Sequence, residues 1–211
     1  MFGVKTSYVK SLSRDGTTET NSRRLAFFSA PKMKVILLFL ASLALARGVS
    51  VLVVNNCWWP LYVHIGMGDG GRWVGAYQTS WGGVGAHDRV WAEQPGVCCD
   101  NSLAEIHDDN GHSWYDISLV DGFTYPIAIT PQGGGGGNRR DLRCTSWGAL
   151  DGCPDGNKVW VNGAVKACRN HDSIRDHMHY WCPTAYSWSG DDQNAMADTW
   201  ADRFDVTFCP P

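Results

Sequence analysis

The segment WYDISLVDGFTYPIAIT, residues 114–130, decides the fold class. Two short runs rich in β-branched and aromatic residues, 114–120 and 123–130, lie on either side of Asp121-Gly122. Such runs are typical of β-strands, and an Asp-Gly dipeptide favours a tight turn. We therefore predict two strands here with a turn between them.

Further strand signals lie towards both ends of the chain. Val49–Val54 is a mostly apolar, β-branched run, whereas Lys158–Val161 and Arg203–Phe208 alternate apolar and polar residues. The last segment places three apolar side chains on one face: Phe204, Val206 and Phe208. Many short strands separated by Gly-rich turns predict an all-β antiparallel sandwich or barrel.

Two segments do not follow the strand pattern. The run Gly133–Gly137 predicts a flexible loop. Ser102-Leu-Ala-Glu105 has the spacing of a helix capping box, so residues 102–107 are the best helix candidate.

The N-terminal region carries an export signal. Met33-Lys34 precedes an apolar run that ends in Ala44-Leu-Ala46, the pattern of a secretory signal peptide. The run is shorter than the roughly 20 apolar residues that span a bilayer, so we expect no transmembrane anchor in the mature protein. Residues 33–46 are therefore interpreted as the signal peptide, residues 1–32 as a non-structural extension, and residues 47–211 as the mature domain.

Composition and charge exclude several classes of protein. The chain has 11 Trp and 18% charged residues, unlike disordered chains and coiled coils. Its net charge is −3, but residues 1–46 hold seven Lys/Arg and two Asp/Glu, which leaves the mature domain at about −8. An acidic domain argues against a nucleic-acid partner. All eight Cys lie in the exported part, so disulfides are expected.

Several ordered motifs resemble the thaumatin-like family, which includes thaumatin, osmotin and the type 5 pathogenesis-related proteins. The match covers nearly all of the mature domain and consists of NNC (55–57), RVW (89–91), SLAEI (102–106), WYDISLVDGF (114–123), CPTAYSWSGDD (182–192) and VTFCP (206–210). The resemblance implies a flattened antiparallel β-sandwich with disulfide-stapled loops. Residues 169–181 replace the cysteine-rich subdomain of larger members, which implies the small type with a shallow, open cleft.

The resemblance also implies three disulfides, Cys57–Cys209, Cys144–Cys182 and Cys153–Cys168. Cys98 and Cys99 stay unassigned, because the disulfide-rich hairpin of this region is missing here. A bridge between these neighbours, two free thiols and an intermolecular bond are all open.

Five residues match the positions that the family places around its cleft: Arg89, Glu105, Asp116, Asp121 and Asp191. Asp116 and Asp121 are five residues apart, so on one continuous strand they would face opposite sides. They can converge only if the chain turns near Asp121-Gly122.

Three uses of this cluster compete. Glu105 as acid and Asp121 as second carboxylate could hydrolyse a glycosidic bond, in line with weak endo-β-1,3-glucanase activity in some members. The carboxylates could instead only bind sugar hydroxyls, or they could form a structural ion-pair network around Arg89.

Tryptophans and histidines could add further sites. An exposed subset of Trp58, Trp59, Trp73, Trp81, Trp91, Trp188 and Trp200 could stack on sugars, although we expect most tryptophans to be core or half-buried. His177 and His179, with His171 and Asp176 nearby, could bind a metal if the segment is extended. We favour a solvated loop instead, and expect no metal and no cofactor.

The sequence thus predicts a secreted, monomeric thaumatin-like protein of the cell wall or apoplast. Its expected partner is β-1,3-glucan or a related wall polysaccharide, with an antifungal, defence or wall-remodelling role. The alternative is an inhibitor of secreted glycoside hydrolases, such as xylanases or amylases, that acts through surface loops.

Mass spectrometry of the secreted protein checks the export signal. Cleavage after Ala46 is expected to give a mature chain that begins at Arg47. A mature N-terminus upstream of Met33 would contradict the interpretation of residues 1–32.

Overall fold

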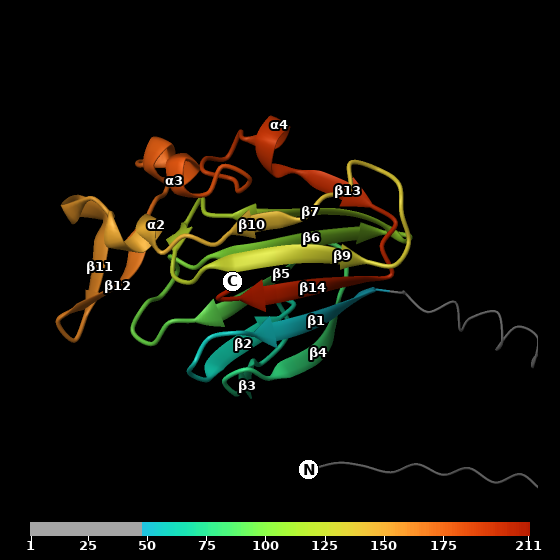
Figure 1. Cartoon of the computed structure of the whole chain (residues 1–211), viewed down its shortest axis with the longest axis horizontal. Helices are drawn as coiled ribbons and strands as arrows, with labels where there is room; N and C mark the ends of the chain where they lie inside the picture. Colours follow the sequence, from blue (N-terminus) through green and yellow to red (C-terminus); the bar gives the residue numbers. More distant parts are fainter. Residues whose placement is uncertain (1–47) are drawn as a thin grey trace, which may run out of the picture. The chain divides into compact units, whose positions relative to one another are not determined.

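The computed structural model describes residues 48–211. The interpretations of residues 1–32 and 33–46 therefore lie outside the described residues. Two β-sheets pack face to face around one hydrophobic core, and a small third sheet lies at one end beside two helices (Figure 1). The chain from 48 onward is thus mostly β, as predicted.

The sheets contain six, five and three strands. The six-stranded sheet has the order β13 (Ala197–Thr199), β7 (His112–Ser118), β6 (Leu103–Asp109), β5 (Asp88–Glu93), β2 (Leu61–Ile65), β3 (Arg72–Val74). The five-stranded sheet has the order β10 (Leu142–Cys144), β9 (Ile127–Gln132), β14 (Arg203–Phe208), β1 (Val49–Asn55), β4 (Thr79–Val84). The small sheet has the order β11 (Lys158–Val161), β12 (Ala164–Arg169), β8 (Gly122–Phe123).

The described helices are short and lie outside the sandwich. They are α2 (Gly148–Asp151), α3 (Arg175–Trp181), α4 (Asp192–Ala195) and the 3-10 turn η1 (Asp155–Asn157). Figure 1 shows α2 and α3 beside β11 and β12, at one end of the two large sheets. From residue 48 onward, every helix is too short or too polar to cross a membrane.

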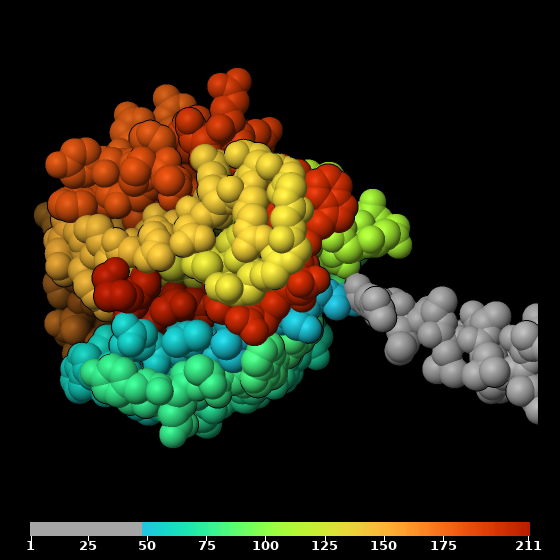
Figure 2. Space-filling view, turned by 45° about the vertical axis from the view of Figure 1, so that its right-hand side comes forward, coloured from blue at the N-terminus to red at the C-terminus, as the bar shows by residue number. Residues whose placement is uncertain are grey.

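The first and last strands lie side by side in the middle of the five-stranded sheet. They run parallel, with Val51 opposite Phe204 and Val53 opposite Val206. This pair departs from the antiparallel arrangement that we expected throughout. Nearly the whole domain lies between the two strands in sequence, and this long connection lets β14 run in the same direction as β1. In Figure 2 the red C-terminal segment lies between the cyan N-terminal strand and the yellow segment, which agrees with the order β9, β14, β1.

The alternating pattern of the strands fills the core. Phe204, Val206 and Phe208 are fully buried, which confirms the predicted inward face of β14. Across the sandwich the Tyr115 ring of β7 packs against Phe204, with 4.9 Å between ring centroids. The predicted strands at 49–54 and 158–161 are confirmed as well. Burial of these aliphatic and aromatic side chains supplies most of the folding free energy.

The helix expected at residues 102–107 is wrong, because this segment forms strand β6. The Ser102 hydroxyl caps no helix and accepts the backbone N–H groups of Thr124, at 3.1 Å, and Tyr125, at 3.3 Å. A single capping-box match is thus outweighed by long-range strand pairing, in which β6 hydrogen-bonds to β5 and β7.

The deciding segment 114–130 also folds differently from the simple two-strand prediction. Strand β7 ends at Ser118, and the chain then crosses from the six-stranded sheet, through β8, to β9 in the five-stranded sheet. Pro126, which has no N–H to donate, separates β8 from β9. Asp121-Gly122 therefore lies at a change of sheet and not in a hairpin turn.

The segment with His177 and His179 is the helix α3 and not the expected loop. Side chains two residues apart on a helix do not face each other, so the two imidazoles cannot act as paired ligands. His177 contacts the Ala149 carbonyl oxygen at 3.0 Å, and His179 Nδ1 lies 3.8 Å from an Asp191 oxygen.

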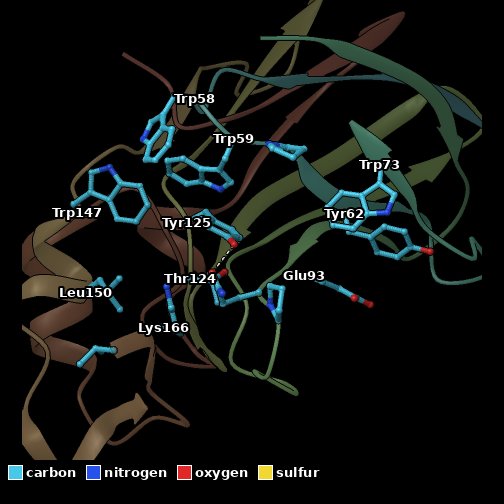
Figure 3. Close-up of a pocket in the computed structure, with 14 residues that line it drawn as sticks. Trp58, Trp59, Tyr62, Trp73, Glu93, Thr124, Tyr125, Trp147, Leu150 and Lys166 are labelled. Carbon is cyan, nitrogen blue, oxygen red and sulfur yellow. Dashed lines mark hydrogen bonds between the residues drawn. The ribbon is translucent and has the colours of Figure 1, made fainter. Parts of the chain in front are cut away.

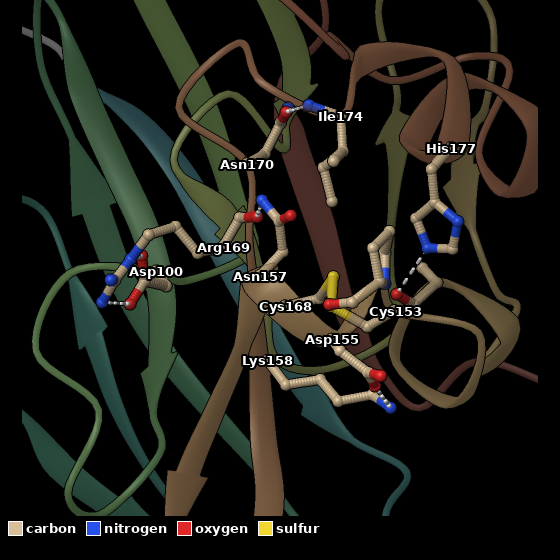
Figure 4. Close-up of a disulfide and its surroundings, with 12 residues drawn as sticks. Asp100, Cys153, Asp155, Asn157, Lys158, Cys168, Arg169, Asn170, Ile174 and His177 are labelled. Carbon is tan, nitrogen blue, oxygen red and sulfur yellow. Dashed lines mark hydrogen bonds and ion pairs between the residues drawn. A yellow bond between two sulfur atoms is a disulfide. The ribbon is translucent and has the colours of Figure 1, made fainter.

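Four disulfides cross-link the described chain. They are Cys57–Cys209, Cys144–Cys182, Cys153–Cys168 and the neighbouring pair Cys98–Cys99. The first three are the pairs that the family resemblance implies. Figure 4 shows Cys153–Cys168 with the ion pairs around it, including Arg169 on the buried Asp100 at 2.9 Å.

Removing disulfides should destabilise the fold in order of loop length. Cys57–Cys209 closes 152 residues and Cys153–Cys168 closes 15. Because a long cross-link restricts the unfolded chain more, we expect the free energy of unfolding to fall by about 4–5 kcal/mol for Cys57→Ala/Cys209→Ala and about 3 kcal/mol for Cys153→Ala/Cys168→Ala. Denaturant titration of the two double variants measures the difference, and the reverse order would contradict the model.

Candidate functional site

Three ionisable side chains form a row across the solvent-facing side of the six-stranded sheet. Arg89 on β5 is directly opposite Glu105 on β6, which is directly opposite Asp116 on β7. Directly opposite residues point to the same face, so strand register alone brings the three together. Arg89 Nε donates to Glu105 Oε1 at 2.7 Å, and both side chains remain partly exposed.

Asp116 differs from its neighbours in environment. Its Oδ1 is buried and has no hydrogen-bond partner. Burial, followed by the negative charge of Glu105, raises the pKa of Asp116 well above its usual value, although Arg89 acts in the opposite direction. The row therefore contains a cation, a carboxylate and a carboxyl group that favours its neutral form.

Asp121 lies next to this row. It lines a cavity of about 370 Å³ together with Arg89, Glu105 and Asp116. Strand β7 ends at Ser118, so the alternation of side chains between its two faces does not extend to Asp121. Asp121 can therefore lie on the same side of the sheet as Asp116. The structure thus brings together four of the five residues selected from the sequence.

Asp191, the fifth residue, does not line this cavity. It is 2% exposed, and its oxygens accept the Ser187 N–H and the Asn194 side-chain amide. Its neighbour Asp192 lines the cavity instead. The sequence contains both aspartates side by side, and no local pattern distinguishes the buried one from the exposed one.

Asp192 and Tyr186 were not selected from the sequence. The Tyr186 hydroxyl donates to Asp192 Oδ1 at 2.7 Å. Burial and this hydrogen bond raise the pKa of Tyr186 well above its usual value, so the hydroxyl stays a donor. The segment that carries both residues is distant in sequence from β5, β6 and β7, and only tertiary structure places it there.

Asn170 holds that segment against the end of β7. Its fully buried side-chain amide donates to the Leu119 carbonyl at 2.9 Å and to the Ser187 carbonyl at 2.7 Å. Its backbone N–H also donates to the Asp121 carbonyl at 2.9 Å. One residue of the 169–181 segment therefore fixes both walls of the cavity relative to each other.

A second cavity, of about 340 Å³, adjoins the same row on its other side. His107 and Trp114 line it and lie directly opposite each other on β6 and β7. His107 also stacks on His87, with 3.9 Å between ring centroids. The charged row is thus bordered by aromatic rings.

The tryptophans are more exposed than expected. None of the eleven is fully buried: five are half-buried, and six are exposed, namely Trp58, Trp73, Trp81, Trp147, Trp160 and Trp200. The prediction that most are core or half-buried is therefore wrong. Valine, isoleucine, leucine and phenylalanine fill the narrow space between the sheets, and the larger indoles lie outside it.

In the described part of the chain, no group of three or more His, Cys, Asp or Glu side chains is arranged to hold a metal ion. What the row offers chemically is a set of hydrogen-bond donors and acceptors beside flat apolar rings.

Sequence comparisons link this architecture to known proteins. No protein-family model matches the chain. Pathogenesis-related protein 5 of Arabidopsis thaliana is 30% identical over 48% of this chain and 52% of its own length. Zeamatin of Zea mays is 29% identical over 86% of this chain and 100% of its own length.

The chain is similar in sequence to proteins of the thaumatin-like family. A third relative, glucan endo-1,3-beta-glucosidase of Prunus avium, is 29% identical over 59% of this chain and 61% of its own length. The chain therefore spans little more than half the length of several curated relatives that it matches. Among solved structures, the thaumatin-like xylanase inhibitor aligns with a TM-score of 0.42 and 12% identity, over 76% of this chain and 99% of that chain.

Replacing Asp116 by its neutral isostere should reveal the cost of ionising it. A carboxyl whose pKa is raised in the folded state binds its proton more tightly there, so folding stability falls as pH rises above about 4. Asp116→Asn should therefore raise the Tm relative to wild type at pH 7, and the difference should shrink to nothing below about pH 4. Thermal unfolding across this pH range measures it, and a variant less stable than wild type at pH 7 would contradict the expected direction.

Proposed function

We propose that this secreted thaumatin-like protein binds β-1,3-glucan or a related cell-wall polysaccharide through the cavity beside Arg89. The observation that carries the proposal is the convergence of Arg89, Glu105, Asp116 and Asp121 on one open cavity. Such a cluster has a structural alternative, an ion-pair network, but only Arg89 and Glu105 form an ion pair in it.

The chemistry of the row suits sugar hydroxyls, which both donate and accept hydrogen bonds. Arg89 is a donor only, the ionised Glu105 is an acceptor only, and a neutral Asp116 can do both. Hydrogen bonds to charged partners are stronger than neutral ones. A buried Asp116 oxygen without a protein partner supports a ligand that would supply one.

Binding accounts for this geometry better than efficient hydrolysis does. A glycosidase needs a carboxylic acid as proton donor and a second carboxylate at a set separation. Glu105, the acid selected from the sequence, is held by Arg89 at 2.7 Å, whereas the carboxyl with the raised pKa is Asp116. We therefore propose binding as the main activity, with weak endo-β-1,3-glucanase activity through Glu105 and Asp121 as a secondary one.

The location and biological role follow as part of the same proposal. Four disulfides suit an oxidising, extracellular environment. The names of relatives, pathogenesis-related protein 5 and glucan endo-1,3-beta-glucosidase, support a defence or wall-directed role. An antifungal or wall-remodelling protein of the apoplast or cell wall fits both.

Pull-down on insoluble β-1,3-glucan tests the binding proposal. Glu105→Gln and Asp121→Asn should each reduce the bound fraction several-fold, because each removes a charged hydrogen-bond partner. Asp151→Asn, which removes an exposed carboxylate of α2 outside the cavity, should bind like wild type. Undiminished binding by both cavity variants would refute the proposed site.

Release of reducing sugar from laminarin by the wild type then separates binder from enzyme. We expect slow release at most, abolished in Glu105→Gln. Rapid turnover would show that the cavity is primarily catalytic.

A further inference from the structure

A third cavity, of about 700 Å³, lies between one edge of the six-stranded sheet and the region of β12 and α2, and six of its fourteen lining residues are aromatic. Figure 3 shows its layout: Trp58, Trp59 and Trp147 lie on one side, Tyr62 and Trp73 on the other, and Tyr125 between the two groups. Its volume is roughly twice that of the cavity beside Asp121.

The rings at its mouth are exposed although burial would be favourable. Trp58 is 76% exposed and Trp73 67% exposed. An exposed indole leaves a large apolar area in water, and clustered apolar area on a soluble surface marks a binding site. This cluster is therefore a candidate ligand site.

The rings are also held in place before any ligand arrives. Trp58 packs edge-on against Trp59 with 5.0 Å between centroids, and Tyr62 packs against Trp73 at 5.3 Å. The rings of Trp59 and Tyr125 lie next to each other, with 6.3 Å between their centroids. Because their freedom is already restricted, a ligand that stacks on them loses little affinity to ordering.

Polar groups border the aromatic surface. Glu93 and Lys166 line the cavity, as does Gln94, which accepts the Tyr125 hydroxyl at 2.5 Å. One oxygen of Glu93 contacts His64 Nε2 at 2.7 Å. Flat apolar rings with a polar edge match a pyranose, which has an apolar C–H face and hydroxyls around its rim; a wholly apolar ligand would leave the charged groups unpaired.

Strand β5 joins this cavity to the charged row. Arg89, Trp91 and Glu93 alternate outward along it, so they point to the same side of the sheet. Trp91 stacks on His64 of β2 with 4.4 Å between centroids and 7° between planes. At about 3.4 Å per residue, Arg89 and Glu93 are roughly 14 Å apart along the strand. An extended chain could contact both ends.

We propose that the aromatic cavity is a second subsite for the polysaccharide bound beside Arg89. The chain would run along β5, over the Trp91–His64 stack, and stack a sugar ring between Trp58 and Trp73. This inference rests on the proposed glucan binding and adds to it a binding surface that recognises several consecutive sugar units.

Calorimetry with two β-1,3-linked ligands, laminaribiose and laminarihexaose, tests the subsite. Wild type should bind the hexasaccharide more tightly than the disaccharide. Trp73→Ala and Trp58→Ala should each weaken hexasaccharide binding about tenfold and remove most of that length preference. Trp81→Ala, which removes a 55% exposed indole from the five-stranded sheet, should bind like wild type. Thermal unfolding of each variant checks that it is folded.

The outcomes separate the two proposals. If Trp58→Ala and Trp73→Ala bind the hexasaccharide like wild type while Glu105→Gln binds it weakly, the subsite is refuted and the glucan-binding function stands. If wild type binds neither ligand, the proposed function fails and the subsite fails with it. The apolar dye ANS tests the remaining possibility. If ANS binds wild type but not Trp58→Ala, and the hexasaccharide does not displace it, the cavity serves an apolar ligand and the subsite is again refuted.

Discussion

The parallel pairing of β1 with β14 is the constraint on which the rest of the structure depends. These strands are the first and last of the described chain, and they lie in the middle of the five-stranded sheet. Each also pairs with a second strand, β1 with β4 and β14 with β9, so this long-range pairing joins the two ends of the domain in one sheet. The Cys57–Cys209 disulfide fixes the same ends covalently.

The five-stranded sheet covers one face of the six-stranded sheet and leaves its other face free. Its inner face packs on β14 and β9 through residues such as Tyr115, and its outer face carries Arg89, Glu105 and Asp116 in register. Burying Asp116 beside another carboxylate costs free energy, and we attribute this cost to the proposed binding role of the face. The rings along β5 and β2 extend the same free face.

The buried faces of the strands could be predicted from the sequence better than the arrangement of the solvent-exposed side chains. Alternation in Arg203–Phe208 and the family motifs led to correct strands and to the class of fold, because burial imposes a period of two on each strand. The helix predicted at residues 102–107 failed because a local capping signal is weaker than pairing with two neighbours. The sequence could not show that Asp192 and not Asp191 lines the cavity, and the expected burial of most tryptophans was wrong, because both depend on which atoms tertiary packing leaves exposed.

We propose that the outer face of the six-stranded sheet is one continuous saccharide-binding surface. An NMR titration of the uniformly ¹⁵N-labelled protein with laminarihexaose tests this without any mutation. Binding along the whole face should shift the Trp73 and Trp91 indole N–H signals together with the Glu105 and Asp116 amide signals. Shifts confined to Trp81 and the five-stranded sheet, or no shifts at saturating ligand, would contradict it.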